Sequence, residues 1–184
     1  MRLIVGISGA SGVLLAVRLL ERLRETEVET HVVASKSAEV VLRAETGLSI
    51  ESIAGLATYY YHPDNLAAAI SSGTFRTEGM VVIPCSMKTL AGIATGYSDN
   101  LLLRAADVTL KERRKLVLVP RESPLHEIHL ENMLRLARMG VIIFMPVPAF
   151  YHHPLTVDQV IDHTVSRVLN FFGIECHLEE WKEE

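Results

Sequence analysis

Short apolar runs alternate along this chain with longer segments in which apolar residues recur every three or four positions. The short runs are typical of buried β-strands, and the longer segments of amphipathic helices that cover a sheet. The runs predict strands at residues 3–7, 29–34, 79–84, 116–120 and 141–145. The longer segments predict helices at residues 14–23, 37–46, 50–56, 66–70, 86–94, 100–114, 128–139 and 157–172. Residues 57–62 fit neither pattern.

Two of these helices carry typical capping residues. Gly140 follows the helix predicted at 128–139 and suits a C-cap, and Thr156 precedes the one at 157–172 and suits an N-cap. Alternating strands and helices imply an α/β fold of three layers, a parallel sheet with helices on both faces. Ligands of such folds bind beyond the carboxyl ends of the strands.

Composition narrows the class of protein. The 184 residues, 49% apolar and 22% charged, suit one domain spanning 1–184, and the acidic residues 179–184 suit a surface tail. A net charge of −4 does not suggest a nucleic-acid partner. The apolar stretch 141–147 is too short to cross a membrane. Because Cys85 and Cys176 cannot build a disulfide framework and no signal peptide is visible, we expect a cytoplasmic location.

The first predicted strand runs into a turn of small residues that contains Gly6, Gly9 and Gly12. Unpaired N–H groups and the helix dipole attract an anion at a helix start, so this turn suggests a phosphate site. Val13 follows where a nucleoside triphosphate loop needs lysine and then serine or threonine, and no acid ends the second strand to hold a ribose. A ligand with one terminal phosphate fits better. The alternative is a turn that only packs a helix on the sheet.

Small, polar or proline-containing segments follow all five predicted strands. In chain order they are Ser8, Gly9 and Ser11; Ser35 and Lys36; residues 85–89; residues 121–123; and residues 146–153. Carboxyl ends of parallel strands meet at one edge of a sheet, so these residues should converge there. We therefore expect a polar pocket for a phosphorylated ligand at that edge.

Six segments, in this order, resemble the motifs of one known family. They are Gly-Ala-Ser-Gly at 9–12, Pro-Cys-Ser-Met-Lys-Thr-Leu at 84–90, Arg-Ala-Ala-Asp at 104–107, Leu-Lys-Glu-Arg at 110–113, Val-Pro-Arg-Glu at 119–122 and Pro-Ala-Phe-Tyr at 148–151. The chain, to about Gly173, resembles the UbiX-type flavin prenyltransferases, formerly described as phenolic-acid decarboxylase small subunits.

The resemblance implies a Rossmann-like, flavodoxin-type fold and a metal-independent transferase. Such enzymes join the dimethylallyl group of dimethylallyl phosphate, or in some members the diphosphate, to N5 and C6 of reduced FMN. The product, prenylated FMN, is the cofactor of UbiD-type decarboxylases, which are the partners that receive it. The resemblance also implies a homododecamer with active sites at subunit interfaces.

The resemblance assigns flavin contacts to residues that follow the strands. They are Gly9, Ala10, Ser11, Ser35, Ser86, Met87, Lys88, Thr89 and Arg121. Ser11 matches a hydroxyl near flavin N5, where it could orient the nucleophile. Ser86 and Thr89 could instead be helix caps.

A second set of residues would hold the allylic phosphate. Arg104 and Lys111, seven residues apart, share a helix face and could form a cationic clamp, although Asp107 also suits an ion-pair ladder with both. Because the chain lacks an aspartate-rich metal motif, the resemblance implies that arginine and lysine stabilise the departing phosphate instead. Arg121, Glu122, Tyr151 and Arg167 match the family's remaining phosphate contacts.

Ring closure at C6 requires a base, and two glutamates match the family's acids. We expect Glu122 to manage protons near the phosphate and Glu45 near the flavin, with Ser11 and Tyr151 completing the catalytic set. The alternatives are a loop salt bridge between Arg121 and Glu122, and a surface acid at Glu45. Neither Cys85 nor the histidines suggest a nucleophile or a metal site.

Two other functions fit parts of the sequence. The related flavin-dependent cysteine decarboxylases share the fold, but they carry a P-x-M-N segment whose asparagine is missing between residues 145 and 150. A flavin carrier or storage protein would need no second phosphate site. Arg104, Lys111, Arg121 and Arg167 therefore favour the prenyltransferase.

Overall fold

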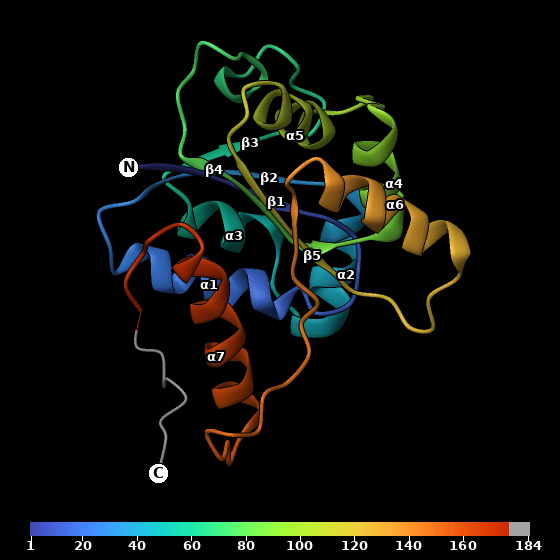
Figure 1. Ribbon diagram of the computed structural model, residues 1–184. Helices are drawn as coiled ribbons and strands as arrows, with labels where there is room; N and C mark the ends of the chain where they lie inside the picture. The colour runs from blue at the N-terminus through green and yellow to red at the C-terminus, as the bar shows by residue number, and fades with distance from the viewer. Residues whose placement is uncertain (177–184) are drawn as a thin grey trace.

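A computed structural model describes residues 1–176, which contain a six-stranded sheet (Figure 1). The strands lie in the order β3-β2-β1-β4-β5-β6 and every pair of neighbours is parallel. They are β1 (Arg2–Ile7), β2 (Glu29–Ala34), β3 (Tyr59–Tyr61), β4 (Gly79–Cys85), β5 (Lys115–Pro120) and β6 (Ile142–Ile143). The expected acidic tail at 179–184 lies outside the described residues.

The strand order confirms the expected Rossmann-like, flavodoxin-type class. Without β3, the five remaining strands have the flavodoxin order 2-1-3-4-5, and β3 extends it to the Rossmann order 3-2-1-4-5-6. The order reverses between β1 and β4, which pair from Leu3 opposite Gly79 to Gly6 opposite Val82. The crevice at such a reversal is where open α/β sheets bind their ligands.

Helices cover both faces of the sheet (Figure 1). One face carries α1 (Leu14–Arg24), α2 (Lys36–Thr46), α3 (Ile50–Leu56) and α7 (Val157–Asn170). The other carries α4 (Met87–Thr95), α5 (Leu101–Lys111), α6 (Glu127–Arg138) and the 3₁₀ helix η1 (Ala69–Ser71).

The central strands are buried on both faces, which explains their unbroken apolar runs. Val5, Val81 and Val117 face the helices of the α1 side, and the neighbouring Met80 and Leu116 face those of the α5 side. Each of these side chains is at most 1% exposed, and burying one contributes about 1.5–3 kcal/mol.

Three predictions of secondary structure need correction. The helix expected at 66–70 is wrong: the segment is a series of turns, in which the Asn65 side chain accepts a hydrogen bond from the Ala67 N–H, followed by η1. The undecided residues 57–62 contain the edge strand β3, which pairs with β2. The strand expected at 141–145 shortens to Ile142–Ile143, since the chain leaves the sheet ahead of Pro146.

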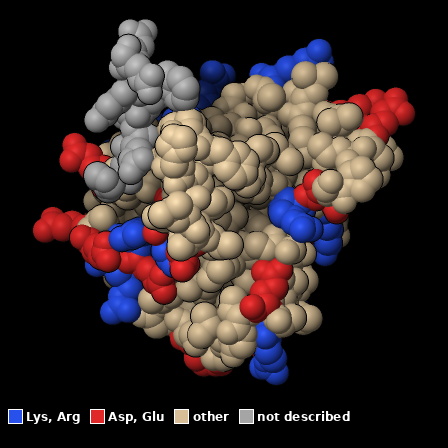
Figure 2. All heavy atoms as spheres, turned by 90° about the horizontal axis from the view of Figure 1, so that it is seen from below, with Lys and Arg blue, Asp and Glu red and all other residues tan. Residues whose placement is uncertain are grey.

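The expected N-cap is confirmed, since Thr156 and Gln159 form a capping box at the start of α7. The C-cap of α6 is Met139 and not Gly140, which follows it with a φ of 88°. No helix within the described residues combines the length and apolar character needed to cross a membrane. Figure 2 shows acidic and basic side chains intermixed on the face seen from below.

Candidate functional site

The carboxyl ends of β1 and β4 are joined by one buried hydroxyl. Ser8 Oγ donates to the Pro84 carbonyl at 2.9 Å and accepts from the Ser86 N–H at 2.7 Å. The sequence analysis named Ser8 only as a residue that follows the first predicted strand. Its position directly after an apolar strand was the signal for this linking role. Through these two bonds the turn after β1 and the start of α4 form one rigid edge, which we call the rim.

Two helices begin at the rim with serine caps. Ser35 Oγ accepts from the Ala38 N–H at 3.2 Å, and Ser86 Oγ accepts from the Thr89 N–H at 3.3 Å. Both serines are therefore helix caps, which the sequence analysis had allowed for Ser86 but not for Ser35. The caps leave the Met87 and Lys88 N–H groups at the amino end of α4 without an acceptor among the described residues. Such donors, with the helix dipole, suit a phosphate.

The turn after β1 is already occupied by a carboxylate. Glu45 Oε2 accepts from the Gly12 N–H at 2.9 Å and from the Val13 N–H at 3.2 Å. Gly12 has a φ of +93°, which turns its N–H and the next one toward the same oxygen. Glu45 is an exposed acid, but it bonds the turn after β1 and not Arg43, which lies 3.9 Å from Glu39.

Gly9 allows the close packing of this turn. A Cβ on Gly9 would lie 2.4 Å from Ser37 Oγ and 2.9 Å from the Ser37 carbonyl carbon. Only glycine lets the turn approach the start of α2 this closely. Ala10 and Ser11, which follow it, are half-buried at the rim.

Arg121 and Glu122 follow β5 at the same edge. The Arg121 N–H donates to the Cys85 carbonyl at 3.2 Å, which places the pair beside the start of α4. Their side chains are exposed and do not pair with each other, so the alternative of a loop salt bridge does not hold. Glu122 Oε1 accepts from the Ser123 N–H at 3.0 Å. A guanidinium and a carboxylate therefore stand separately at the rim.

Arg104 and Lys111, on α5, each pair with an acid of their own subunit. Arg104 pairs with Asp107 at 2.8 Å and donates to the Ser71 carbonyl at 3.2 Å, while Lys111 pairs with Glu112. Of the two ion pairs expected with Asp107, the one with Arg104 forms and the one with Lys111 does not. Since α5 ends just before β5 begins, the length of that strand, roughly 20 Å, separates Lys111 from Arg121.

Tyr151 belongs to a projecting part of the molecule, and Arg167 lies in the last turn of α7. Tyr151 lies in the loop between β6 and α7, and this loop and the start of α7 extend below the rest of the protein in Figure 1. The Tyr151 hydroxyl lies 2.9 Å from His163 Nε2 on α7. The sequence analysis did not single out His163, although it stands four residues before Arg167 and so lies on the same face of α7.

Cys85 is fully buried. Burial raises the pKa of the Cys85 thiol far above its ordinary value, so it is not a nucleophile. Residues 1–176 contain no group of three histidine, cysteine, aspartate or glutamate side chains placed to hold a metal ion. Metal independence stays a prediction.

The fold and the rim define a class of protein. A parallel α/β sheet whose order reverses beside serine-capped helix starts is typical of proteins that bind a flavin mononucleotide. The sequence profile of the Flavoprotein family matches residues 1–169. The chain is also 59% identical over 175 residues to a probable UbiX-like flavin prenyltransferase of Streptomyces sp. (strain D7), covering 95% of this chain and 88% of that one. The chain belongs to the UbiX-like flavin prenyltransferases, as its motifs implied.

Solved structures agree. A dodecameric FMN-dependent UbiX-like decarboxylase from Escherichia coli O157:H7 superposes with a TM-score of 0.97 at 58% identity, over all of both chains. AnUbiX (PadA1), solved with FMN and dimethylallyl pyrophosphate, superposes with a TM-score of 0.97 at 47% identity, over 100% of this chain and 98% of that one.

The cysteine decarboxylases are more distant. The peptidyl-cysteine decarboxylase EpiD has a TM-score of 0.67 at 19% identity, covering 94% of this chain and 98% of that one. This likeness shows the shared fold alone. It agrees with the missing asparagine in residues 145–150.

Proposed function

We propose that this protein joins the dimethylallyl group of dimethylallyl phosphate to N5 and C6 of reduced FMN and releases prenylated FMN and phosphate. The observation that carries the proposal is the rim, where free N–H donors and hydroxyls meet separate acidic and basic side chains. The relative solved with FMN and dimethylallyl pyrophosphate supports the same pair of ligands.

The flavin would lie along the rim between β1 and β4. Its phosphate suits the amino end of α4, where Ser86, Met87, Lys88 and Thr89 offer backbone and hydroxyl donors. The close turn at Gly9, Ala10 and Ser11, with Ser35 beside it, would contact the rest of the flavin nucleotide. When bound, reduced FMN supplies the nucleophilic N5, and we place the Ser11 hydroxyl near it.

The allylic phosphate needs cations, because breaking its C–O bond leaves negative charge on the phosphate. Arg121 stands at the rim without a carboxylate partner among the described residues, and we assign it to this phosphate. Glu122, beside it, would hold or move a proton at the phosphate. Glu45, whose carboxylate is fixed 2.9 Å from the Gly12 N–H, would accept the proton lost from the flavin.

The remaining phosphate contacts come from a neighbouring subunit in this proposal. Lys111 lies at the end of α5 far from the rim, Arg104 is bound to Asp107 and the Ser71 carbonyl, and Tyr151 and Arg167 belong to the projecting loop and α7. A subunit can supply these residues to another copy's rim more easily than to its own. A site shared in this way would be complete only in the oligomer.

Exposed apolar side chains on the projecting part support assembly. Val147, Phe150, Leu155 and Val157 are between 70% and 89% exposed. An apolar group of this kind usually marks an interface. We propose that a second copy covers it and that the assembly is a homododecamer, as in the relative from Escherichia coli O157:H7.

A UbiD-type decarboxylase would receive the prenylated FMN as its cofactor. The cytoplasmic location also stays a prediction. It rests on the absence of a disulfide between Cys85 and Cys176, both of which are free thiols.

One anaerobic experiment tests the function. The purified protein is mixed with reduced FMN and dimethylallyl phosphate without magnesium, and the released flavin is analysed by mass spectrometry. We expect a mass increase of one C5H8 unit. Unmodified flavin, with FMN bound and the diphosphate also tested, would favour a carrier instead. Release of carbon dioxide from a cysteine-terminated peptide would favour a decarboxylase.

A further inference from the structure

Helix α6 is covered by its own subunit along a narrow contact only. It lies beside α4 (Figure 1), and of its residues, all of which the structure describes, Leu136 alone is buried. Met133 packs against the same core and is half-buried. A helix on the surface of a subunit usually buries a broad apolar stripe. In the single subunit, α6 therefore presents most of its surface to solvent.

A second apolar stripe runs along an exposed face of α6. Leu130, Leu134 and Ala137 are all exposed, Leu130 by 53% and Leu134 by 52%. Spacings of four and three residues place them on one helix face, which we call the α6 stripe. The buried Leu136 lies on another face, because two residues turn a helix by about 200°. Apolar residues at these spacings are typical of the seam between two packed helices.

The charged residues beside the α6 stripe are divided along the helix. Glu127 and Glu131 stand in its amino half, and Arg135 and Arg138 in its carboxyl half. All four project on the same side of the α6 stripe, at about 100° of turn per residue. None of them forms an ion pair with another residue that the structure describes.

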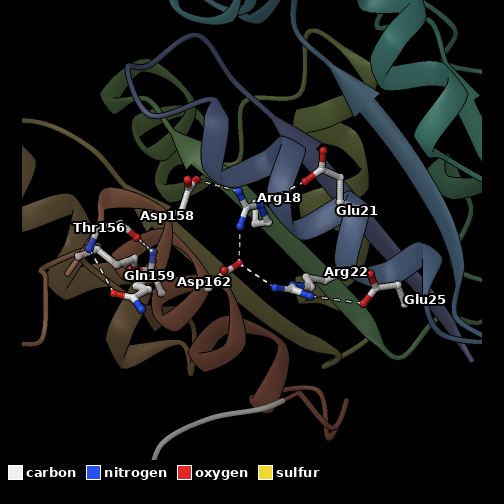
Figure 3. A network of polar contacts seen from close by, with 10 residues as sticks. Arg18, Glu21, Arg22, Glu25, Thr156, Asp158, Gln159 and Asp162 are labelled. Carbon is white, nitrogen blue, oxygen red and sulfur yellow. Dashed lines mark hydrogen bonds and ion pairs between the residues drawn. The ribbon is translucent and has the colours of Figure 1, made fainter. Parts of the chain in front are cut away.

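The charged residues between α1 and α7 show the opposite arrangement. Arg18 pairs with Asp158 at 2.9 Å and with Asp162 at 2.7 Å, and Arg22 pairs with Asp162 at 3.1 Å (Figure 3). The acids and bases of that contact belong to one subunit and pair there. Those of α6 are suited to pair with a second molecule instead.

The best match to α6 is a second α6 that runs in the opposite direction. When Leu130 of one helix lies opposite Leu134 of the other, Glu131 stands within about 3 Å, along the axis, of the second copy's Arg135. In the same register Glu127 stands within about 1.5 Å, along the axis, of the second copy's Arg138. A parallel pair would place acid beside acid. The antiparallel pair is identical seen from either helix, as a two-fold axis requires.

The proposed assembly needs a contact of this kind. Sharing α5 and the projecting loop with a neighbouring rim joins two different surfaces, and such head-to-tail contacts close into a ring. A dodecamer that is not one large ring needs a further contact between smaller rings, and two-fold contacts are the commonest kind. Helix α6 belongs to neither the rim nor the shared surfaces.

We propose that the α6 stripe packs antiparallel against the α6 stripe of a second copy about a two-fold axis, and that this contact joins smaller rings into the dodecamer. Glu131 pairs across the axis with Arg135, and Glu127 with Arg138. This inference rests on the proposed function and its shared site, and it adds an interface that takes no part in the chemistry.

The first test concerns the α6 stripe. Native mass spectrometry and sedimentation velocity over a dilution series give the concentration at which half of the dodecamer has dissociated. Leu134→Gln places a polar amide in the contact twice, so this midpoint should rise at least tenfold. Ile128→Gln is the matched control, because Ile128 is another apolar residue of α6, is 62% exposed and lies on a different face. Its midpoint should stay within about threefold of the wild type.

The second test concerns the direction of the paired helices. Glu131→Arg brings two bases together across the axis and Arg135→Glu two acids, so each should raise the midpoint about fivefold or more. The double variant Glu131→Arg/Arg135→Glu restores opposite charges and should return to within about threefold of the wild type. If these charges only matched the dipole of their own helix, the double variant would be the least stable of the three, since both of its charges oppose that dipole.

The outcomes separate this interface from the proposed function. The smaller rings should bind FMN at full stoichiometry and prenylate it within about threefold of the wild-type rate. An unchanged midpoint for Leu134→Gln, or for Glu131→Arg should the glutamine variant not fold, would overturn the α6 contact. A double variant no better than the single reversals, or a wild type that is never larger than one small ring, would overturn it too. A wild-type dodecamer that binds FMN without prenylating it would overturn the proposed function and leave the α6 contact in place.

Discussion

Glu45 accepts a hydrogen bond of 2.9 Å from the backbone N–H of Gly12, a residue 33 positions earlier in the chain. The amino end of α1, where sequence reasoning expected a phosphate, therefore carries a carboxylate of the protein itself. A negative charge is stabilising at this place because of the helix dipole. The bond fixes Glu45 beside Ser11, so that the two predicted flavin-side residues lie at one turn.

Replacing Glu45 with glutamine should separate binding from catalysis. Glu45→Gln keeps an oxygen that can accept from the Gly12 N–H but removes the base. We expect at least a tenfold loss in the rate of prenylated FMN formation and an FMN Kd within about threefold of the wild type. Anaerobic single-turnover assays and fluorescence titration measure the two quantities. Glu39→Gln, a surface change on the same helix, should alter neither, and a wild-type rate for Glu45→Gln would remove Glu45 from the proton pathway.

The Ser11 hydroxyl should matter to the rate and little to flavin binding. Ser11→Ala leaves the backbone of the turn and the donors of α4 in place, so FMN should bind nearly as in the wild type. The prenylation rate should fall at least tenfold, because the hydroxyl that orients N5 is gone. Rapid-quench mass spectrometry follows the rate, with Ser52→Ala on the exposed part of α3 as control. Equal rates for Ser11→Ala and the wild type would contradict the role.

The strands and most helices could be predicted because their apolar periodicity reflects burial. Val5, Val81 and Val117 stand in runs that are apolar throughout, and a strand covered on both faces needs such a run. The edge strand β3 was undecided because its tyrosines are half-buried or exposed and show no alternation. The prediction of a helix at 66–70 is wrong because a local turn at Asn65 competes with helix formation.

The sequence could predict only those site residues whose place follows from the common direction of the strands. Ser11, Ser86 and Arg121 come directly after strands, so a parallel sheet places them on one rim. The contact of Glu45 with Gly12 depends on how α2 packs against α1, which no local pattern records. Likewise, the face shared by Arg104 and Lys111 follows from helical periodicity, but the partners of these side chains depend on tertiary structure.

Subunit sharing predicts complementation between two inactive variants. Lys111→Ala and Ser11→Ala should each prenylate FMN slowly as pure oligomers. Co-expressed in equal amounts, they should recover activity at about a quarter of the sites, where an intact rim meets an intact α5 of the neighbour. The assay is product formation by mixed oligomers purified through two different tags. Mixtures no more active than their components would show that Lys111 does not act across an interface.

The salt bridges of Asp162 should make the attachment of α7 to α1 sensitive to acid. Partial burial alone would raise the pKa of the Asp162 carboxyl, but hydrogen bonds from Arg18 and Arg22 outweigh it and hold the pKa below its ordinary value of 3.8. A carboxyl with a depressed pKa stabilises the folded state above the pKa of the unfolded chain, and this contribution is lost as the pH falls through the folded pKa. Acid should therefore weaken the contacts that fasten α7.

Asp162→Asn should lower the stability by on the order of 1 kcal/mol at neutral pH, since the network is only partly buried. We expect a fall of about 2–4 °C in Tm. The difference from the wild type should begin to shrink below about pH 4 and vanish as the pH falls through the lower pKa of the folded Asp162 carboxyl, because that carboxyl then becomes neutral as well. Differential scanning calorimetry across this range measures it. Asp158→Asn is the control and should have a smaller effect, because this carboxyl is 71% exposed and pairs with Arg18 alone among the described residues. A difference between Asp162→Asn and the wild type that stays constant down to pH about 2 would show that packing, and not the charge of Asp162, connects α7 to α1.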